Sequence, residues 1–367
     1  MWEKNGLVKR STQNPILTPI EDHWWESRLV YNTGAVQLGG RIYLLYRAMG
    51  EDHVARFGLA FSADGINFTR LVYPVFFPET EYETPHSSKI NHNRERGGVE
   101  DPRLMVVGDT IYVIYTAFHK MCHLAMTKIS IAKFLNMVDE SEKFLEKDLS
   151  MEWNSTWKRV GLLFPHLFEV PEMFSRNSVM LQLQKGLHIL FYRIHKGDIL
   201  VSLSSNPEGP WKDKSIPFLT KQLPWEMERI GISTPAIPVS DNGMRKFLLF
   251  YHGVEERKTE RNLIKVYHLG ALFLSAKIED KKVILKTERL KHPVLSPERD
   301  YELENEWLLS VGVNAVFSCG AVPVGKDTIY IYYGSGDTNI SLGRAFISEL
   351  LQQEKITEIC EIDRTLF

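Results

Sequence analysis

A short strand pattern that recurs five times along the chain constrains the fold more than any other feature of the sequence. Each copy is a turn followed by a run of Ile, Leu, Val, Phe and Tyr that ends in tyrosine, which is typical of a buried β-strand. A strand-like segment precedes each copy and another follows it, so the repeating unit is three or four antiparallel strands. The tyrosine-ended runs lie at 41–46, 109–115, 187–192, 244–251 and 326–333.

Repeated antiparallel units of this size predict an all-β fold, a five-bladed β-propeller with one unit per blade. Two tandem sandwiches are the alternative, but five similar units divide poorly into two. A stretch at 131–149 has helical spacing and is interpreted as an insertion between the second and third blades, and residues 348–355 predict a short C-terminal helix. We expect a single domain over 1–367, with blades beginning near residues 28, 98, 175, 231 and 312.

Composition and charge exclude several classes of protein. The 367 residues include 44 basic and 46 acidic side chains, whereas a nucleic-acid-binding protein usually has a basic excess. Neither a long apolar run nor the apolar segment of a signal peptide is present, so we expect a cytoplasmic protein that binds neither membrane nor nucleic acid. The widely spaced cysteines Cys122, Cys319 and Cys360 predict neither a disulfide framework nor a zinc site.

Polar residues recur at equivalent positions of the five units. In a propeller these positions meet around the central axis, so the alignment itself predicts a site. Two arginines and a histidine favour an anion, because guanidinium groups bind phosphate or carboxylate through paired hydrogen bonds. Structural ion pairs are the alternative for each residue taken alone. Asn32, Asp101 and Arg176 lie in the segments before the repeats, and Arg47, Arg193 and His252 directly follow the repeated tyrosines.

Asp101 stands in the segment Glu100-Asp101-Pro102-Arg103. Because neighbouring side chains on a regular strand point to opposite faces, we expect Asp101 to face the central channel and Glu100 to point away. Burial in a partly dry funnel would raise the pKa of Asp101 and suit it to donate a proton. The alternative is a structural ion pair with Arg103.

Several other polar and aromatic residues allow two interpretations. Asp337 follows the fifth tyrosine pair and either caps a turn or binds sugar hydroxyls. His86, His92 and Asn93 suggest a metal or nuclease loop, but no second ligand cluster supports one, so we expect a solvated loop and no metal site. The tryptophans at 24–25 either pack or form a rim that stacks on sugars.

Seven motifs, taken together, resemble glycoside hydrolase family 130. They are Asn14-PILTP, Tyr31-NTGAV, Leu44-LYRA, Val99-EDPRL, Tyr251-HGV, Val266-YHLGA and Tyr333-GSGDT, and the match runs from about residue 14 to 348. The resemblance implies a five-bladed propeller that acts on β-mannosides. Most members are phosphorylases, which cleave the β-mannosyl linkage with inorganic phosphate and release α-mannose 1-phosphate, and some are β-1,2-mannosidases that use water.

The resemblance also implies a role for individual residues. Asp101 matches the general acid, whose proton reaches the glycosidic oxygen through a hydroxyl of the bound mannose. The family's hydrolases lack the phosphate-binding set and place glutamates in that region, so His252 and Tyr267 favour phosphate as the nucleophile. Arg176, Arg193, His252 and Tyr267 match the phosphate-binding set, and Asn32, Arg47 and Asp337 match residues that hold the mannosyl ring.

The expected function is therefore that of an inverting β-mannoside phosphorylase, with inorganic phosphate as co-substrate and no cofactor. One alternative is an inverting β-mannosidase, which needs a second carboxylate to activate water, with Glu226 or Glu228 as the candidate base. Another is a propeller that binds glycans without catalysis. The expected partners are a β-mannoside oligosaccharide and phosphate, and a homo-oligomer is compatible with the sequence.

Overall fold

The computed structural model describes residues 2–84, 97–170, 173–195, 197–239, 245–258, 263–303 and 313–367. Each tyrosine-ended run is the middle of an antiparallel unit, so the mostly-β prediction is confirmed. Tight turns begin these strands, and the pair Gly39-Gly40, with φ of 55° and 83°, has the left-handed backbone that two-residue hairpins require. The tyrosine strands are β3 (Arg41–Met49), β7 (Thr110–Phe118), β11 (Leu187–Ile194), β16 (Arg245–Lys258) and β20 (Thr328–Ser335).

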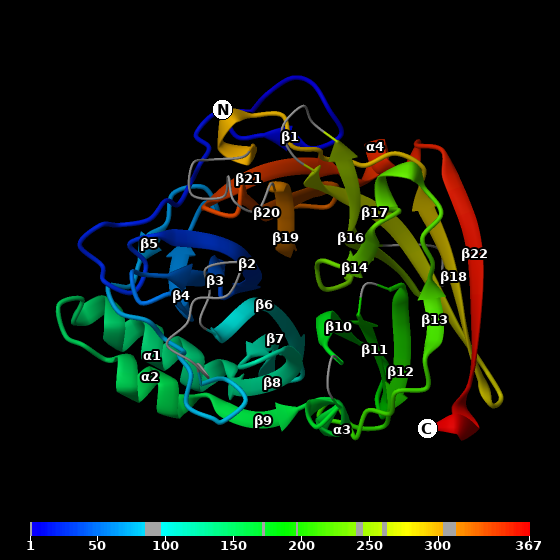
Figure 1. The fold of residues 1–367 in the computed structure, drawn as a ribbon, viewed down its shortest axis with the longest axis horizontal. Coiled ribbons are helices and arrows are strands. Elements are labelled where there is room, and N and C mark those ends of the chain that lie inside the picture. Colours follow the sequence, from blue (N-terminus) through cyan, green and yellow to red (C-terminus); the bar gives the residue numbers. More distant parts are fainter. Residues whose placement is uncertain are drawn as a thin grey trace.

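Each tyrosine strand pairs with an inner strand that precedes it and with a third strand that follows it. The inner strands lie nearest the middle of the view in Figure 1, with the units following one another around them. They are β2 (Leu29–Leu38), β6 (Gly97–Val107), β10 (Ser175–Gln184), β14 (Arg229–Ile232) with β15 (Ile237–Val239), and β19 (Val313–Pro323). The third strands are β4 (Val54–Ser62), β8 (Cys122–Ser130), β12 (Ile199–Ser204), β17 (Leu263–Glu279) and β21 (Asn339–Phe346).

The outermost strands show how the two ends of the chain are used. The N-terminal strand β1 pairs with β21, so residues from both ends build the last unit. The long strand β22 (Lys355–Asp363), which the sequence analysis did not predict, pairs with β18. The described strands form no closed sheet, and the five-bladed propeller stays a prediction. The fourth strands of the five units are β5 (Thr69–Arg70), β9 (Lys158–Leu162), β13 (Ile216–Leu219), β18 (Lys282–Leu290) and β1 (Lys9–Arg10), and β22 lies outside β18.

The repeated tyrosines share one buried interaction. Each hydroxyl donates a hydrogen bond of 2.5 to 2.9 Å to an acid, and in four units an arginine on the fourth strand also pairs with that acid. Burial and then the neighbouring carboxylate raise the pKa of these tyrosines, so they remain hydrogen-bond donors. The tyrosine, acid and arginine sets are Tyr46, Glu26 and Arg70; Tyr115, Glu83 and Arg159; Tyr251, Glu226 and Arg289; and Tyr333, Glu302 and Arg10, with Tyr192 bonded to Asp213.

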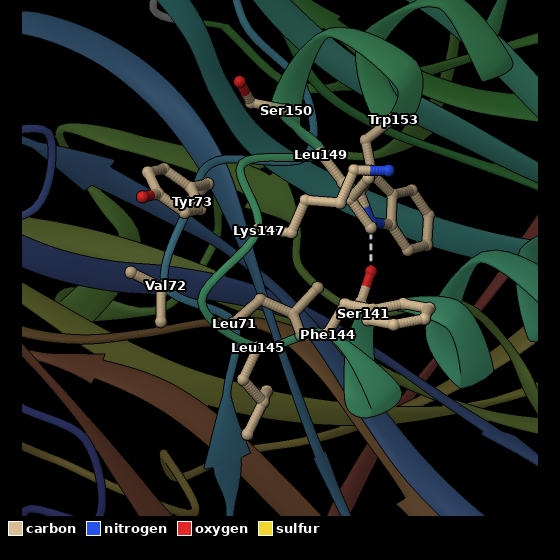
Figure 2. A pocket seen from close by; sticks show the side chains of 10 residues that line it. All are labelled: Leu71, Val72, Tyr73, Ser141, Phe144, Leu145, Lys147, Leu149, Ser150 and Trp153. Atoms are coloured by element: carbon tan, nitrogen blue, oxygen red, sulfur yellow. Dashed lines mark hydrogen bonds between the residues drawn. The ribbon is translucent and has the colours of Figure 1, made fainter.

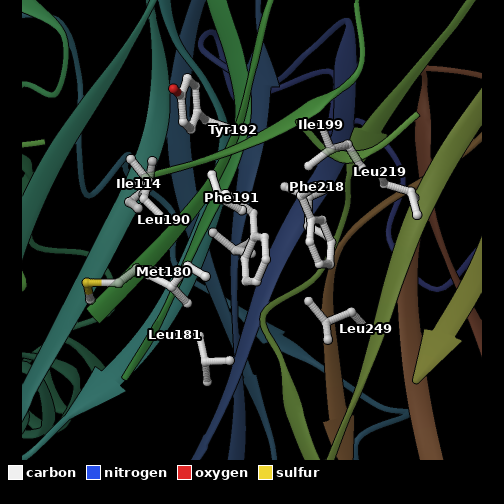
Figure 3. Packing of buried hydrophobic residues seen from close by; sticks show 14 of the residues in the cluster. Ile114, Met180, Leu181, Leu190, Phe191, Tyr192, Ile199, Phe218, Leu219 and Leu249 are labelled. Carbon is white, nitrogen blue, oxygen red and sulfur yellow. The ribbon is translucent and has the colours of Figure 1, made fainter. Parts of the chain in front are cut away.

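Apolar side chains fill the space between neighbouring units. Figure 3 shows Ile114 of the second unit, Phe191 of the third and Leu249 of the fourth within one buried cluster. Burial of about 25 cal/mol per Å² of apolar surface is the main stabilising contribution to such an arrangement. The inner strands are thereby fixed relative to one another, and it is these strands that carry the site residues.

The predicted helical insertion is confirmed as α1 (Ile131–Lys143), and a second helix, α2 (Ser150–Thr156), follows it. The Ser130 side chain caps α1 by accepting a hydrogen bond from the Lys133 amide. Figure 2 shows the indole of Trp153 donating to the Ser141 hydroxyl at 2.9 Å beside a small cavity. That cavity holds about 20 Å³, room for about one water, so it is a packing gap and not a binding site.

The remaining helices are short. The C-terminal helix α4 spans Ile347–Leu351, less than the predicted 348–355, because the chain turns into β22. Among the described residues, the others are α3 (Pro165–Phe168) and three single turns of 3₁₀ helix at Pro224–Glu226, Asp300–Glu302 and Arg364–Leu366.

Candidate active site

Three inner strands carry the same local irregularity. Their register against the tyrosine strand shifts directly after Tyr31 in β2, Glu100 in β6 and Arg176 in β10. The next residue in each has a left-handed backbone, a conformation that Asn and Asp tolerate better than other side chains. Such bulges re-aim side chains near functional sites. The left-handed residues are Asn32, Asp101 and Asn177, with φ of 45°, 51° and 54°.

The candidate site has an acidic end and a basic end. Asp101 lies buried at the acidic end, with 5% of its surface exposed. Its Oδ1 accepts a hydrogen bond of 2.9 Å from the Asn32 side-chain amide and lies 3.2 Å from Nη1 of Arg47. Arg103 donates to the backbone carbonyl of Asp101 at 2.9 Å and to the Ser233 carbonyl at 2.8 Å. The partners of the carboxylate are therefore Asn32 and Arg47, and Arg103 holds the backbone that presents it.

The predicted rise in the pKa of Asp101 is wrong. Burial alone would raise that pKa, but Arg47, Arg103 and Arg176, together with the Asn32 hydrogen bond, hold it below its ordinary value. Three guanidinium groups around one carboxyl outweigh its loss of hydration. Protonation of Asp101 near neutral pH therefore requires a change in the charge around it.

Glu100 shares a partner with Asp101, although a regular strand would place the two side chains on opposite faces. Its Oε1 lies 2.9 Å from Nη2 of Arg47, and its Oε2 lies 2.9 Å from Nη2 of Arg176. Arg47 therefore contacts two carboxylates that are adjacent in sequence. The expectation of opposite faces holds only for a regular strand, and the bulge at Asp101 breaks that alternation.

A cluster of basic side chains forms the second end of the site. Arg176 and Arg193 face each other across β10 and β11. Burial and then the charges of Arg229 and Arg176 lower the pKa of Arg193 to about 9, so it still carries its charge at neutral pH. Arg193 donates to the His195 backbone carbonyl, and within the described residues it has no carboxylate partner. A buried guanidinium whose nearest charges are other guanidinium groups is suited to an anion.

His252 and Tyr267 complete this cluster. Burial, and then Arg193, Arg103 and Arg229, lower the pKa of His252 well below its ordinary value, so the ring is neutral at pH 7. The Asn177 side-chain nitrogen lies 3.3 Å from Nε2 of His252. The centre of the His252 ring lies 6.2 Å from that of the Tyr267 ring, and the Tyr267 hydroxyl accepts a hydrogen bond from Arg229. The four predicted phosphate-binding residues therefore lie together.

The last unit approaches the acid through a close backbone contact. A Cβ on Gly334 would lie 2.3 Å from Oδ1 of Asn32, so only glycine fits beside this residue. Asp337 lies in the turn that follows, with φ of 52°. That turn contacts β2, where the Val30 amide donates to the Thr338 carbonyl at 3.1 Å. The turn with Asp337 therefore lies against the strand that carries Asn32.

Some residues considered from the sequence have other roles. Glu226 is fully buried in the pair with Arg289 and the bond to Tyr251, so it is a structural member of the repeated interaction and not a catalytic base. Glu228 pairs with Lys265 at 3.1 Å and lies 3.9 Å from Arg229.

The tryptophans at 24–25 have different surroundings. Trp25 is buried and donates to the Val72 carbonyl at 2.9 Å, which is a packing role, whereas Trp24 is 57% exposed beneath Arg56.

His86, His92 and Asn93 lie outside the described residues. In the part of the chain that is described, no cluster of His, Cys, Asp or Glu could hold a metal ion, and none of the three cysteines forms a disulfide. None of the described helices is long and apolar enough to cross a membrane.

Sequence reasoning placed Asn177 among the converging polar positions but gave it no role, and it missed Arg229; both belong to the site. Asn177 follows Arg176 as Asp101 follows Glu100 and Asn32 follows Tyr31, so the aligned repeats contained the signal. Arg229 begins β14 and has no equivalent in the other units that would have identified it.

Known proteins match the chain over nearly its whole length. The Glyco_hydro_130 family model, described as beta-1,4-mannooligosaccharide phosphorylase, matches residues 3–355. The chain belongs to glycoside hydrolase family 130. The predictions of the family and of a glycoside phosphorylase within it are therefore confirmed.

Individual members of family 130 match over almost the whole chain. A 1,2-beta-oligomannan phosphorylase of Thermoanaerobacter sp. (strain X514) is 30% identical over 344 residues, 91% of this chain and 96% of the relative. A beta-1,2-mannobiose phosphorylase of the same strain is 30% identical over 365 residues, 95% and 98% of the two chains. The structure of beta-1,2-mannobiose phosphorylase from Listeria innocua in complex with beta-1,2-mannobiose has a TM-score of 0.64 at 22% identity, covering 94% of this chain and 98% of that one, and shows a shared fold.

Proposed function

We propose that the protein is an inverting β-mannoside phosphorylase. It cleaves a β-mannosyl linkage with inorganic phosphate and releases α-mannose 1-phosphate, without a cofactor. The observation that carries the proposal is the cluster of Arg176, Arg193 and Arg229 around the neutral His252, in which Arg193 has no carboxylate partner within the described residues. A phosphate dianion would offset this charge, whereas an attacking water would need a base in its place.

Asp101 is the proposed general acid, and Asn32, Arg47 and Asp337 are the proposed mannosyl-binding residues. Asn32 and Arg47 contact the acid directly, at 2.9 and 3.2 Å, so a sugar held by them would lie beside it. One carboxylic acid is enough for this reaction, because phosphate is already a charged nucleophile and needs no general base. Inversion requires phosphate to attack from the side of the anomeric carbon opposite the leaving oxygen.

The proposed substrate is a β-1,2-linked mannoside, because two relatives at 30% identity are named for that linkage. We also propose that the five antiparallel units are the blades of a five-bladed propeller, with the paired β1 and β21 joining both chain ends in the last blade. The inner strands of such a propeller would bring residues of all units to one axis. The single domain, the cytoplasmic location and a homo-oligomer stay predictions.

Phosphate dependence tests the proposed function. Purified protein is incubated with β-1,2-mannobiose, with and without inorganic phosphate, and mannose 1-phosphate and free mannose are measured separately. The proposal expects mannose 1-phosphate only when phosphate is present. Equal cleavage without phosphate would instead identify a hydrolase, and Glu228 would then be the base to substitute. Turnover of no mannoside under either condition would support a binding protein.

A further inference from the structure

Glu100 joins the two ends of the site. Its side chain is fully buried, and its two oxygens each lie 2.9 Å from a guanidinium group, one of Arg47 and one of Arg176. Arg47 in turn lies 3.2 Å from Asp101. A continuous row of four charged side chains therefore runs from the acid, through Arg47 and Glu100, to an arginine of the anion cluster.

We propose, on the basis of the function proposed above, that Glu100 is a positioning residue that keeps Asp101 able to accept the proton it later donates. It does so by holding Arg47 and Arg176 in place and offsetting their charge. In the same arrangement, phosphate that binds to Arg176 adds negative charge at the far end of the row. The arrival of the nucleophile would then prepare the acid for proton transfer.

The charges that face Asp101 come from several strands. Arg47 lies on β3, Arg176 on β10 and Arg103 on β6 beside the acid, and together they hold the pKa of Asp101 below its ordinary value. Cys319 of β19 also faces it, but burial raises the pKa of that thiol to about 12, so it is neutral.

Glu100 therefore opposes two of the three guanidinium groups that act on the acid. Removal of its charge would leave these groups to act on Asp101 without that opposition, and the acid would be harder to protonate. Two charges about 6 Å apart interact by an amount that shifts a pKa by about one to two units in a partly buried site.

The decisive variant is Glu100→Gln, which keeps the size of the side chain and removes its charge. A general acid works when protonated, so activity falls as the pH rises through its pKa. A lower pKa moves this alkaline limb to lower pH. In the pH profile of kcat, we expect the alkaline limb to move by about one to two pH units toward lower pH. The KM for phosphate should not rise, because Arg176 is no longer shared with a carboxylate.

Glu83→Gln is the matched control. Glu83 is equally buried and also bonds to an arginine, Arg159, but it belongs to the repeated structural interaction outside the site. This variant should lower the melting temperature and leave the pH limb in place. If Glu100→Gln lowers the melting temperature but leaves the limb unmoved, Glu100 is only structural and the inference is wrong.

A second measurement applies even if Glu100→Gln does not fold. The binding of sulfate to the wild-type protein is measured by calorimetry at about pH 5, where a carboxyl group whose pKa rises takes up protons, in buffers of different ionisation enthalpy. We expect proton uptake on sulfate binding, and its loss in Asp101→Asn. No uptake, or equal uptake in Asp101→Asn, would overturn the inference. Cleavage of mannosides without phosphate would instead overturn the proposed function, so the two failures are distinguishable.

Discussion

Substitution of Arg193 by methionine gives the sharpest test of the anion cluster. Methionine keeps an unbranched, flexible stem that fills the buried space and removes only the guanidinium group. Among the described residues, the charges that most lower the pKa of Arg193 are those of Arg229 and Arg176, and its one hydrogen-bond partner is the His195 carbonyl. The variant therefore loses an anion ligand without leaving any of the described acids uncompensated.

The size of the effect follows from the strength of such contacts. A hydrogen bond to a charged group contributes about 1.5–3 kcal/mol, which corresponds to about 10- to 150-fold in a binding constant. The KM for phosphate should rise by this factor, while the KM for the mannoside stays within about twofold. Folding should not suffer, because the substitution removes a buried positive charge that its neighbours repel.

The assay varies phosphate at saturating β-1,2-mannobiose, and then the mannoside at saturating phosphate, with mannose 1-phosphate as the readout. Thermal denaturation is followed in parallel. Arg289→Met is the control, because the same change there breaks a buried pair with Glu226. Removal of one partner of such a pair costs about 3–5 kcal/mol, so this control should melt lower while its KM for phosphate stays unchanged.

The reasoning is refuted by either of two results. One is an unchanged KM for phosphate in Arg193→Met, since a guanidinium group that contacts phosphate cannot be removed without loss of affinity. The other is an equal rise in both KM values together with a lower melting temperature. That result would mean that Arg193 supports the fold as Arg289 does.

Three further predictions concern the acid and the cluster. Asp101→Asn keeps the shape of the acid but not its transferable proton, so turnover of an unactivated mannoside should fall about 100-fold or more, and near wild-type turnover would contradict the assignment. Arg229→Met should raise the KM for phosphate about tenfold or more, whereas the neighbouring Lys265→Met should not. Cys122 lies 2.8 Å from Arg176, so phosphate should slow its alkylation, and equal rates at matched ionic strength would place phosphate elsewhere.

The site was only partly predictable from the sequence. The aligned repeats identified Asp101, Arg176, Arg193 and His252, because equivalent strand positions lie together in a repeated fold. They did not identify the shared role of Glu100, since the argument assumed a regular strand. The left-handed backbone at Asp101 brings both carboxylates to Arg47, and this is visible only in the three-dimensional arrangement.

The repeated tyrosine also had a partner that the sequence analysis overlooked. In three places a proline stands eight positions before an aromatic residue, and a glutamate directly follows that aromatic residue. The pairs are Pro74 and Tyr82, Pro217 and Trp225, and Pro293 and Tyr301. Those glutamates accept the tyrosine hydroxyl bonds of the second, fourth and fifth units. This pattern would have assigned Glu226 to the fold and removed it as a candidate base.

By itself the sequence determined the strand repeat, the helical insertion and the family, because hydrophobic pattern and motif are local properties of the chain. Only the tertiary structure decided which charges meet. Arg229 of the fourth unit acts on Arg193 of the third, and Glu100 of the second unit lies between Arg47 of the first and Arg176 of the third. Such contacts depend on how separate strands pack and on where one of them bulges. A local sequence pattern therefore does not predict them.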